Sequence, residues 1–457
     1  MEQGPGNRDS ADDLSQARIS AVLAAIEADE GAALAAALEP LHPADIADLL
    51  EQISAAERRA LVALHPSAID GDVLSELDEG VREEIIEALP RAALAEAVRE
   101  LDTDDVVDIL EDLETQDQAF ILEALESDDR VAVESAMAWP EESAGRLMQA
   151  ETVTAPEHWT VGQAIDHLRA AEWLPDQFYH VILVDPRHRP VGYVTLGRVL
   201  AARREVPLAS ITEDSFRTIE ATRLQSEVAL IFNKYHLIST PVVDGAGRLV
   251  GVITIDDAMI VLDDEHEEDL LRMAGVQSEA ALSDSIFEAV RGRVPWLAVN
   301  LVTAVLASSV VGLFSGAIET LVALAVLMPI VASMGGNAGT QTMAVTVRAL
   351  ATRELTPANA LRVVFREGAV GVMNGVIMGL GVGLVALLWF GTPMLGVVIA
   401  LAMLGTLMVA ALAGIAIPLL LDRLKIDPAL ASGPFVTTVT DVVGFFAFLG
   451  LASLVLL

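Results

Sequence analysis

The side chain most able to do chemistry in this sequence is Asp441, the only formal charge within the last 25 residues. It follows Thr437, Thr438 and Thr440 in an apolar stretch. A carboxylate inside a hydrophobic span costs at least about 2.5–3.5 kcal/mol, so it should face a partner or a wet cavity. Asp441 therefore predicts a cation-attracting position on a water-filled path. The alternatives are an ion pair with an arginine such as Arg366, or a protonated carboxyl in a helix contact.

A second unusual stretch is PIVASMGGNAGTQT, residues 329–342, where small and polar residues replace the leucines of a lipid-facing helix. Asn337 and Gln341 are four residues apart, so their side chains share one helix face. Three glycines allow close backbone approach or an opened helix, which is tolerated at this depth only inside protein or facing water. The alternative is helix packing through small residues alone.

The oxygen ligands available in these two stretches suit a hard cation. Carboxylate, carbonyl and water favour Mg²⁺ or Ca²⁺, whereas the absence of cysteine, and of histidine in the apolar segments, disfavours zinc and copper. Mg²⁺ dehydrates reluctantly, so a few oxygens around a hydrated ion would serve it. On this ground Mn²⁺, Co²⁺ and Ca²⁺ stay open.

Five apolar segments must position these residues, and each exceeds the roughly 20 residues that span a bilayer. Every basic residue beyond position 293 falls in the region of the second and third segments' connection, which includes Arg366 in the first turn of the third segment, or between the fourth and fifth segments. By the positive-inside rule the N-terminal half is cytoplasmic and the C-terminus is outside, in a multi-pass protein of the plasma (cell inner) membrane. The polar start of the chain, with no signal-like apolar core, agrees. The predicted spans are 294–316, 319–347, 363–390, 394–421 and 433–457.

The charge is distributed very unevenly. The chain has 66 acidic and 28 basic residues, a net charge of −38, yet 53% of its residues are hydrophobic. Residues 294–457 hold six acids and six bases, so residues 1–293 carry the whole excess. Such an acidic surface excludes nucleic acid as a partner and attracts divalent cations. The alternative is that the negative charge only keeps the protein soluble. The lack of cysteine excludes disulfides and fits a reducing compartment.

The acidic half reads as several parts. Residues 1–15 look like a disordered tail, and residues 16–139 show helical periodicity with acidic outer faces. ADIADLL at 44–50 and DDVVDIL at 104–110 align with an offset of 60, which indicates stacked helical hairpins in a solenoid-like array.

Residues 140–262 contain a repeat with an offset of 59. VILVDPRHRPVGYVTLGRVL, at 181–200, aligns with TPVVDGAGRLVGVITIDDAM, at 240–259, and each unit reads strand, turn, strand, helix. This doubling resembles a tandem pair of cystathionine-β-synthase (CBS) domains. Residues 263–292 then read as a helical connector before the membrane domain, 293–457.

The order of these parts resembles the MgtE family of magnesium channels. PIVASMGGNAGTQ and DPALASGPFVTTVTD are close to that family's pore segments, and SAGRLM at 143–148 precedes the CBS pair. The expected fold is a multidomain membrane protein: an all-α acidic N-terminal domain, an α/β tandem CBS pair, a connecting plug helix and a five-helix transmembrane domain. The likeness runs from about Leu38 to the end of the chain.

The resemblance implies a Mg²⁺-selective channel that mediates magnesium uptake, built as a homodimer with its pore on the twofold axis. A hydrated Mg²⁺ is expected near Asp441, with Asn337 lining the path. Cytosolic Mg²⁺ is expected to close the pore by binding the acidic domain, the CBS pair and the plug. The implied regulatory ligands are Asp104, Asp108, Asp257, Glu265, Glu268, Asp269 and Asp427.

Some features depart from the family or leave other functions open. Ile260 stands where a relative has an acid, and the first CBS unit has Gly197 and Arg198 where an ATP-binding acid would follow Thr195. These departures count against ATP as a cofactor. A channel or carrier for Co²⁺ or Mn²⁺, or a non-conducting cation or nucleotide sensor, are the alternatives. No enzyme motif such as His-Glu-x-x-His appears, so no enzyme is expected.

Overall fold

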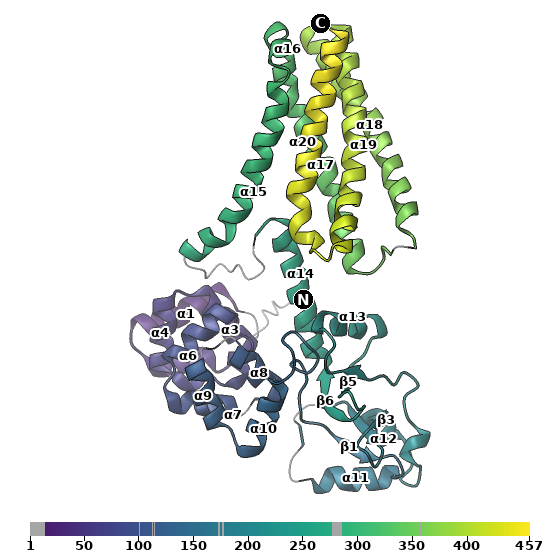
Figure 1. The fold of residues 1–457 in the computed structure, drawn as a ribbon. Coiled ribbons are helices and arrows are strands. Elements are labelled where there is room, and N and C mark those ends of the chain that lie inside the picture. Colours follow the sequence, from purple (N-terminus) through teal and green to yellow (C-terminus); the bar gives the residue numbers. More distant parts are fainter. Residues whose placement is uncertain are drawn as a thin grey trace, which may run out of the picture. The chain divides into compact units, whose positions relative to one another are not determined.

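The computed structural model describes residues 14–99, 101–111, 113, 115–171, 174–175, 178–276, 286–356 and 358–457. The chain divides after Asp263 into two compact units, called unit 1 and unit 2 below. Unit 1 holds a helical domain and two small sheets, and unit 2 holds long apolar helices (Figure 1). Most of the tail expected at 1–15 lies outside the described residues.

The acidic helical domain is a stack of short helices. Local signals start them: Pro43 opens α3, and Ser54 forms a capping box with Glu57 at α4. α3 packs on α5, α4 on α6, α5 on α7, α7 on α9 and α8 on α10, as stacked hairpins require. The bounds are α1 Gln16–Glu27, α2 Gly31–Leu38, α3 Pro43–Gln52, α4 Ala55–Leu64, α5 Gly71–Ser75, α6 Glu79–Ala88, α7 Arg91–Arg99, α8 Thr103–Glu111, α9 Thr115–Ala124 and α10 Ser127–Ala136.

The second half of unit 1 contains two three-stranded sheets of the same topology, β1-β2-β3 and β4-β5-β6. In each, the first pair of strands is parallel and the second antiparallel. The bounds are β1 Thr154–Pro156, α11 Val161–Ala170, β2 His180–Val184, β3 Pro190–Thr195, α12 Leu196–Ala201, β4 Ile219–Glu220, α13 Gln225–Tyr235, β5 Ser239–Val243 and β6 Leu249–Thr254. The tandem CBS pair predicted from the repeat is confirmed.

The repeat is visible even in the hairpin turns. Asp185 accepts hydrogen bonds from the backbone N–H groups of Arg187 and Arg189, at 2.8 and 2.9 Å. Asp244 accepts equivalent bonds from the N–H groups of Ala246 and Arg248, also at 2.8 and 2.9 Å. An aspartate that bonds its own backbone stabilises a tight turn, which explains the matched aspartates in the two sequence repeats.

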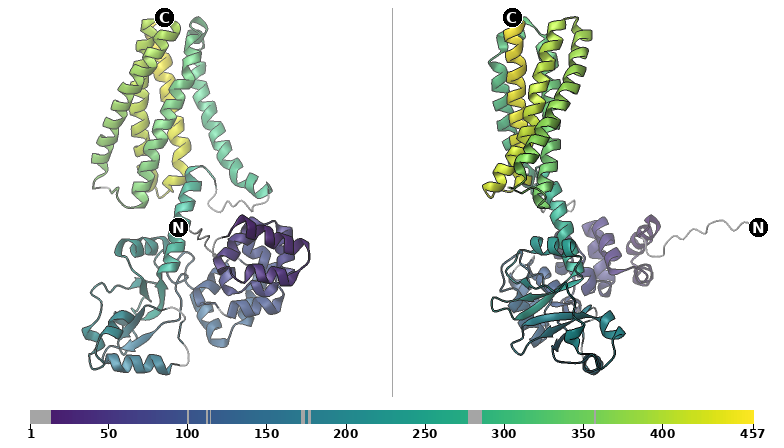
Figure 2. Two further views of the ribbon diagram at one scale, coloured as in Figure 1. Left: turned by 180° about the vertical axis from the view of Figure 1, so that it is seen from behind. Right: turned by 90° about the vertical axis from the view of Figure 1, so that its right-hand side faces the viewer.

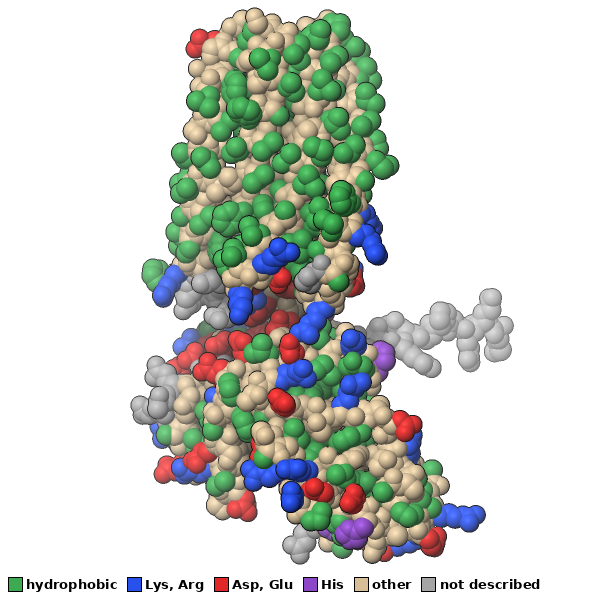
Figure 3. Space-filling view, turned by 45° about the vertical axis from the view of Figure 1, so that its right-hand side comes forward, with side chains coloured by type: hydrophobic (Ala, Val, Ile, Leu, Met, Phe, Trp, Pro, Cys, Tyr) green, Lys and Arg blue, Asp and Glu red, His purple; other side chains and the backbone are tan. Residues whose placement is uncertain are grey.

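Unit 2 contains five helices long and apolar enough to span a membrane, as predicted. They are α15 Ile286–Gly312, α17 Ala323–Ala351, α18 Ala360–Phe390, α19 Pro393–Arg423 and α20 Pro428–Val455. α17, α18, α19 and α20 pack side by side, whereas α15 contacts α20 and splays away at one end (Figures 1 and 2). Hydrophobic side chains cover the visible face of the bundle, and Lys and Arg side chains gather at one end (Figure 3).

At two places the helices begin or end at other residues than the predicted segments. The first two spans were expected at 294–316 and 319–347, but α15 ends at Gly312 and a short helix, α16 Ser315–Thr320, precedes α17. The turn itself was expected around FSGAIE, residues 314–319, and residues 315–319 lie in the short helix. The connector expected at 263–292 begins inside a longer helix: α14, Ile255–Met273, starts directly after β6, while the division into two units falls after Asp263, beside the expected boundary. Residues 277–285 of that connector lie outside the described residues.

Glycine brings α18 and α19 into backbone contact. A Cβ atom placed on Gly383 would lie 2.7 Å from the carbonyl oxygen of Gly396, and one on Gly396 would lie 2.7 Å from the carbonyl oxygen of Gly383. Small residues permit this close approach, which is the usual way that membrane helices gain packing energy. The α18–α19 pair therefore packs backbone against backbone at these glycines.

Candidate ion path and ion-sensing sites

Asp441 lies on α20 beside the face that packs into the bundle. Thr440 and Phe448 are fully buried on that packed face, whereas Asp441 is half-buried and Thr437, one turn earlier, is exposed. Among the described residues, Asp441 has no ion-pair or hydrogen-bond partner, so the pairing with Arg366 considered above is not formed. An unpaired carboxylate at this depth requires water, a cation or another chain beside it.

α17 exposes a row of polar side chains in the middle of a membrane span: Ser333, Asn337, Thr340 and Gln341. The helix is continuous through this row, so the glycines do not open it. Lipid offers no hydrogen-bond partner to these groups, and burying an amide without one costs several kcal/mol on water-to-hydrocarbon scales. The row therefore needs a polar surrounding that the described residues of one copy do not provide.

The polar row and Asp441 lie at the same level of the bundle. A Cβ atom on Gly335 would lie 2.9 Å from the methyl group of Thr406 and 3.5 Å from Cβ of Thr440. A Cβ atom on Gly339 would lie 2.7 Å from a methyl group of Val436. These glycines seat α17 against α19 and α20 on either side of Asn337. Gly335 and Gly339 thus serve helix packing, the alternative considered for this stretch. Asn337 and Asp441, in contrast, lie off the packed helix faces.

A second group of charges joins α14 to the start of α20, inside unit 2. Asp427 accepts a 2.8 Å hydrogen bond from the backbone N–H of Ala429 and so caps α20. Its other carboxylate oxygen lies 3.3 Å from the guanidinium of Arg272 on α14. Asp269 is half-buried beside them; burial and the Asp427 charge raise its pKa, against the lowering effect of Arg272 and His266.

Glu265 and Glu268 lie three residues apart on α14, and Glu268 precedes Asp269 directly. Glu265, Glu268, Asp269 and Arg272 thus follow the spacing of one helix face. Glu268 makes a 2.6 Å ion pair with Arg272. The structure therefore brings Glu268, Asp269 and Asp427 around one arginine, which the sequence reasoning did not single out.

A third group of charges lies in unit 1, where the first turn of α8 meets the first turn of α14. Asp104 is only 8% exposed, and its Oδ1 atom is buried without a hydrogen-bond partner. Asp257 accepts hydrogen bonds from the backbone N–H of Thr254, at 3.2 Å, and from its hydroxyl. Burial raises the pKa of Asp257 to about 6. Two of the implied ligands, Asp104 and Asp257, therefore lie close enough together for the charge of one to act on the other.

Sequence reasoning missed two members of this group. Burial and the neighbouring Asp257 raise the pKa of Asp105 to about 7. Glu151 accepts a hydrogen bond from the Thr103 hydroxyl and a 3.4 Å bond from the Thr103 N–H, at the start of α8. The only sequence signal was the paired aspartate in TDDVVDIL; nothing local marks Glu151, which lies 48 residues away.

Like charges dominate this group, which we call the α8–α14 carboxylate cluster: Asp104, Asp105, Glu151 and Asp257. Burial and then the charges of Asp257, Asp105, Asp102 and Glu151 raise the pKa of Asp104. Such carboxylates must take up protons or a cation. The orphaned oxygen of Asp104 and the all-oxygen donor set fit a hard divalent ion. In the described parts of the chain, however, no three acidic or histidine side chains are already arranged to hold one.

Asp108 lies apart from that cluster. Its carboxylate is exposed and pairs with Arg82 at 2.6 Å, while Arg82 also donates to the backbone oxygen of Leu77 at 2.9 and 3.1 Å. The observed contacts tie α8 to α6, so Asp108 serves a structural ion pair in this conformation.

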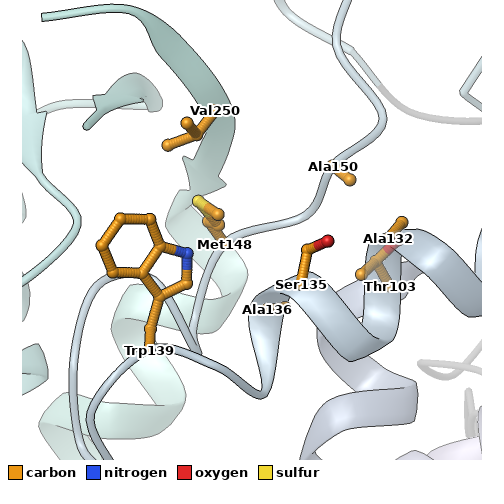
Figure 4. A pocket seen from close by; sticks show the side chains of 8 residues that line it. All are labelled: Thr103, Ala132, Ser135, Ala136, Trp139, Met148, Ala150 and Val250. Atoms are coloured by element: carbon orange, nitrogen blue, oxygen red, sulfur yellow. The ribbon is translucent and has the colours of Figure 1, made fainter. Parts of the chain in front are cut away.

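Two cavities in unit 1 differ from these charged groups. One has a volume of about 220 Å³ and a largely apolar lining; its Ser135 hydroxyl bonds a backbone oxygen within α10 (Figure 4). Its lining contains no carboxylate and so offers an ion no charged ligand. The lining residues are Thr103, Ala132, Ser135, Ala136, Trp139, Met148, Ala150 and Val250.

The other cavity lies between the two CBS units and measures about 20 Å³. His180 and Ser239, at equivalent positions of the repeat, hydrogen-bond across it. That volume admits about one water molecule and no nucleotide. The expectation against ATP stays a prediction.

The fold and these groups define a class: a multi-pass membrane protein with a helical domain, a CBS pair and oxygen ligands for a hard cation. Sequence models of known families agree with each part. A divalent cation transporter model (MgtE) matches residues 328–451, the MgtE intracellular N domain matches 41–142, and CBS domains match 144–205 and 209–264.

Whole-chain comparisons reach the same family. The chain is 32% identical over 442 residues to the magnesium transporter MgtE of Thermus thermophilus, covering 94% of this chain and 97% of that protein. It is 30% identical over 322 residues to the MgtE of Bacillus subtilis, covering 70% and 71%. The chain belongs to the MgtE family of magnesium transporters, and so is a transporter of Mg²⁺ with an intracellular N domain and not an enzyme.

Two solved structures each match about half of this chain. The cytosolic domain of the Mg²⁺ channel MgtE in complex with ATP is 30% identical, with a TM-score of 0.49, and matches 53% of this chain and 99% of that one. The soluble part of a magnesium transporter is 21% identical, with a TM-score of 0.46, and matches 55% and 98%.

Proposed function

We propose that this chain forms a Mg²⁺-selective channel for magnesium uptake across the plasma membrane, closed by Mg²⁺ on the cytosolic side. The C-terminus lies outside the cell. The observation that carries the pore is the unpaired carboxylate of Asp441 at the level of the exposed polar row on α17. A hydrated ion needs such oxygen groups and retains most of its own water.

The channel is a homodimer with the ion path on its twofold axis. One chain leaves Ser333, Asn337, Thr340 and Gln341 exposed, and a second copy related by twofold symmetry supplies the polar counterpart. Two copies of Asp441 would then flank the axis and attract a divalent ion. α15, whose span is only 6% buried within one chain, offers further surface to a second copy.

Closure uses the two acidic groups outside the pore. Mg²⁺ at the α8–α14 carboxylate cluster would neutralise Asp104, Asp105 and Asp257, and Mg²⁺ at α14 would bind Glu265, Glu268, Asp269 and Asp427. Each ion shifts the balance toward the closed state only through its greater affinity for that state. Several weak sites acting together give a steep response.

The pore is tested by Asp441→Ala in proteoliposomes that contain the purified full-length protein. We expect loss of Mg²⁺ flux with normal membrane insertion, because the charge that attracts the ion is removed. Asp422→Ala, which removes an exposed acid at the end of α19, is the matched control and should conduct normally. Flux that persists in Asp441→Ala would remove the pore assignment.

Selectivity and conduction are tested in the same vesicles with competing ions. We expect Mg²⁺ to permeate in preference to Mn²⁺, Co²⁺ and Ca²⁺. Preferred flux of Co²⁺ or Mn²⁺ would establish the other-cation alternative, and absence of any flux from a correctly inserted protein would favour a non-conducting sensor.

Gating is tested by neutralising the α14 face in the variant Glu265→Gln, Glu268→Gln, Asp269→Asn. This variant should conduct at internal Mg²⁺ concentrations that close the wild-type channel, because the ion loses its ligands on α14. Exposed acids on α10, changed as Asp128→Asn and Asp129→Asn, provide the control. Inhibition retained at the wild-type concentration would count against this sensor.

A further inference from the structure

Arg272 is the cation at the contact between α14 and α20. One guanidinium nitrogen lies 2.6 Å from Oε2 of Glu268, one turn earlier on the same helix. The other lies 3.3 Å from Oδ2 of Asp427, which caps α20. The Arg272 side chain is only 28% exposed, so the pair is partly shielded from solvent and salt.

Both oxygens of Asp427 are engaged in this arrangement. Oδ1 accepts from the N–H of Ala429, and Oδ2 receives the guanidinium. The carboxylate is therefore held by the helix cap in a fixed position toward α14. An arginine fork suits such an oriented carboxylate better than a flexible ammonium does.

An apolar contact accompanies the ion pair. Met273, the next residue on α14, packs against the buried cluster of Met343, Val347, Ala429 and Val436 at the base of α17 and α20. Charge and packing therefore act on the same two helices at neighbouring positions. Without Arg272, the repulsion between Asp269 and Asp427 would be offset only by His266 among the neighbouring charges that act on Asp269.

We propose that Arg272 is a positioning residue that serves as a built-in counter-cation, holding α14 on α20 and lowering the Mg²⁺ concentration needed to close the channel. The inference rests on the proposed gating function. The arginine supplies one positive charge permanently. Mg²⁺ from the cytosol then has to neutralise only the negative charge that the arginine leaves unbalanced. Its role is regulatory and does not touch the conducted ion.

The first test is the Mg²⁺ dependence of flux in Arg272→Gln full-length protein. The half-inhibitory internal Mg²⁺ concentration should rise about three- to tenfold, as expected for loss of a partly shielded ion pair. Maximal flux at low Mg²⁺ should not change. Arg272→Lys should restore part of the shift, and Arg423→Gln, an exposed arginine at the end of α19, should produce none.

A double-mutant cycle and a cross-link make the test specific. Arg272→Gln should add no further shift in an Asp427→Asn background. The chain has no cysteine, so Met273→Cys with Ala429→Cys reports docking of α14 directly through the rate of cross-linking. In Mg²⁺-free buffer that rate should fall at least threefold when Arg272→Gln is added, or Arg272→Met if the glutamine variant is not inserted.

An unchanged half-inhibitory concentration would overturn the proposal. So would a shift to lower Mg²⁺, which would mean that the arginine competes with the ion. Failure of the gating function itself is distinguishable, because the wild-type channel would then show no inhibition by internal Mg²⁺ at all.

Discussion

The α8–α14 carboxylate cluster of unit 1 and the α14–α20 contact of unit 2 are both acidic, but they differ in how their charge is balanced. At Asp104 every leading influence, burial and four neighbouring acids, raises the pKa. At Asp269, by contrast, the positive charge of Arg272 on the same helix lowers the pKa. A cluster of carboxylates without an arginine needs protons or metal ions from solution to neutralise its charge. A cluster that contains an arginine needs them to neutralise only part of its charge.

This comparison predicts that the largest loss of Mg²⁺ response follows changes in unit 1. In Asp104→Asn with Asp257→Asn, the Mg²⁺ concentration that protects 137–153 from proteolysis should rise at least tenfold, or protection should become independent of Mg²⁺. Asparagine removes the repulsion that the ion would neutralise and weakens its binding. The measurement is limited proteolysis of the full-length protein across a Mg²⁺ series.

The paired change Asp128→Asn with Asp129→Asn on α10 again supplies the control. If the double variant in the cluster keeps the wild-type Mg²⁺ midpoint, then protons or other contacts hold α8 on α14, and the contrast between the two sites disappears.

A second, smaller effect is expected from pH in the absence of divalent ions. The pKa values of Asp105 and Asp257 rise from the ordinary 3.8 to about 7 and about 6 when the cluster forms. The assembled cluster thus binds more protons than its separated parts, so its stability is fully present below about pH 4 and is lost as pH rises toward 7.

With a chelator present, proteolysis between α10 and β1 should accelerate on the order of tenfold from pH 5.5 to pH 8. Saturating Mg²⁺ should flatten this dependence, because the ion binds the deprotonated form. Cross-linking of α14 to α20 in unit 2 should change less over the same range. A rate that falls with rising pH would contradict the assigned direction.

The smallest effect is expected at Asp108, the implied ligand that the structure places on Arg82. Asp108→Asn should lower the unfolding free energy of the helical domain by about 1 kcal/mol, a melting shift of roughly 2–4 °C. The Mg²⁺ midpoint should stay the same, and Arg82→Gln should destabilise the domain more, because it also removes the hydrogen bonds to the Leu77 oxygen. If Asp108→Asn changed the Mg²⁺ midpoint of protection from proteolysis without lowering stability, Asp108 would be a Mg²⁺ ligand after all.

Much of this architecture could be predicted because it rests on local or periodic signals. The matched aspartates of the CBS repeat bond their own turns, and five apolar runs became five long helices. Asp104 and Asp257 were chosen by resemblance and do meet. Arg272 was missed because its pairing with Glu268 follows an ordinary i,i+4 helix spacing, while Asp427, the partner that gives it a role, lies 155 residues away. Glu151 was missed because Thr103 lies 48 residues away. The turn between the first two spans was expected around FSGAIE, but the short helix α16 that forms there was not.

The sequence by itself determined the membrane class, the order of the parts, the uneven charge and the presence of a carboxylate in the last span, since composition and periodicity decide whether a segment enters lipid. Only the tertiary structure decided which face of α17 stays polar and exposed, which acids are buried together and which meet an arginine. Those properties depend on packing between distant segments, and burial and neighbouring charge control how a carboxylate behaves.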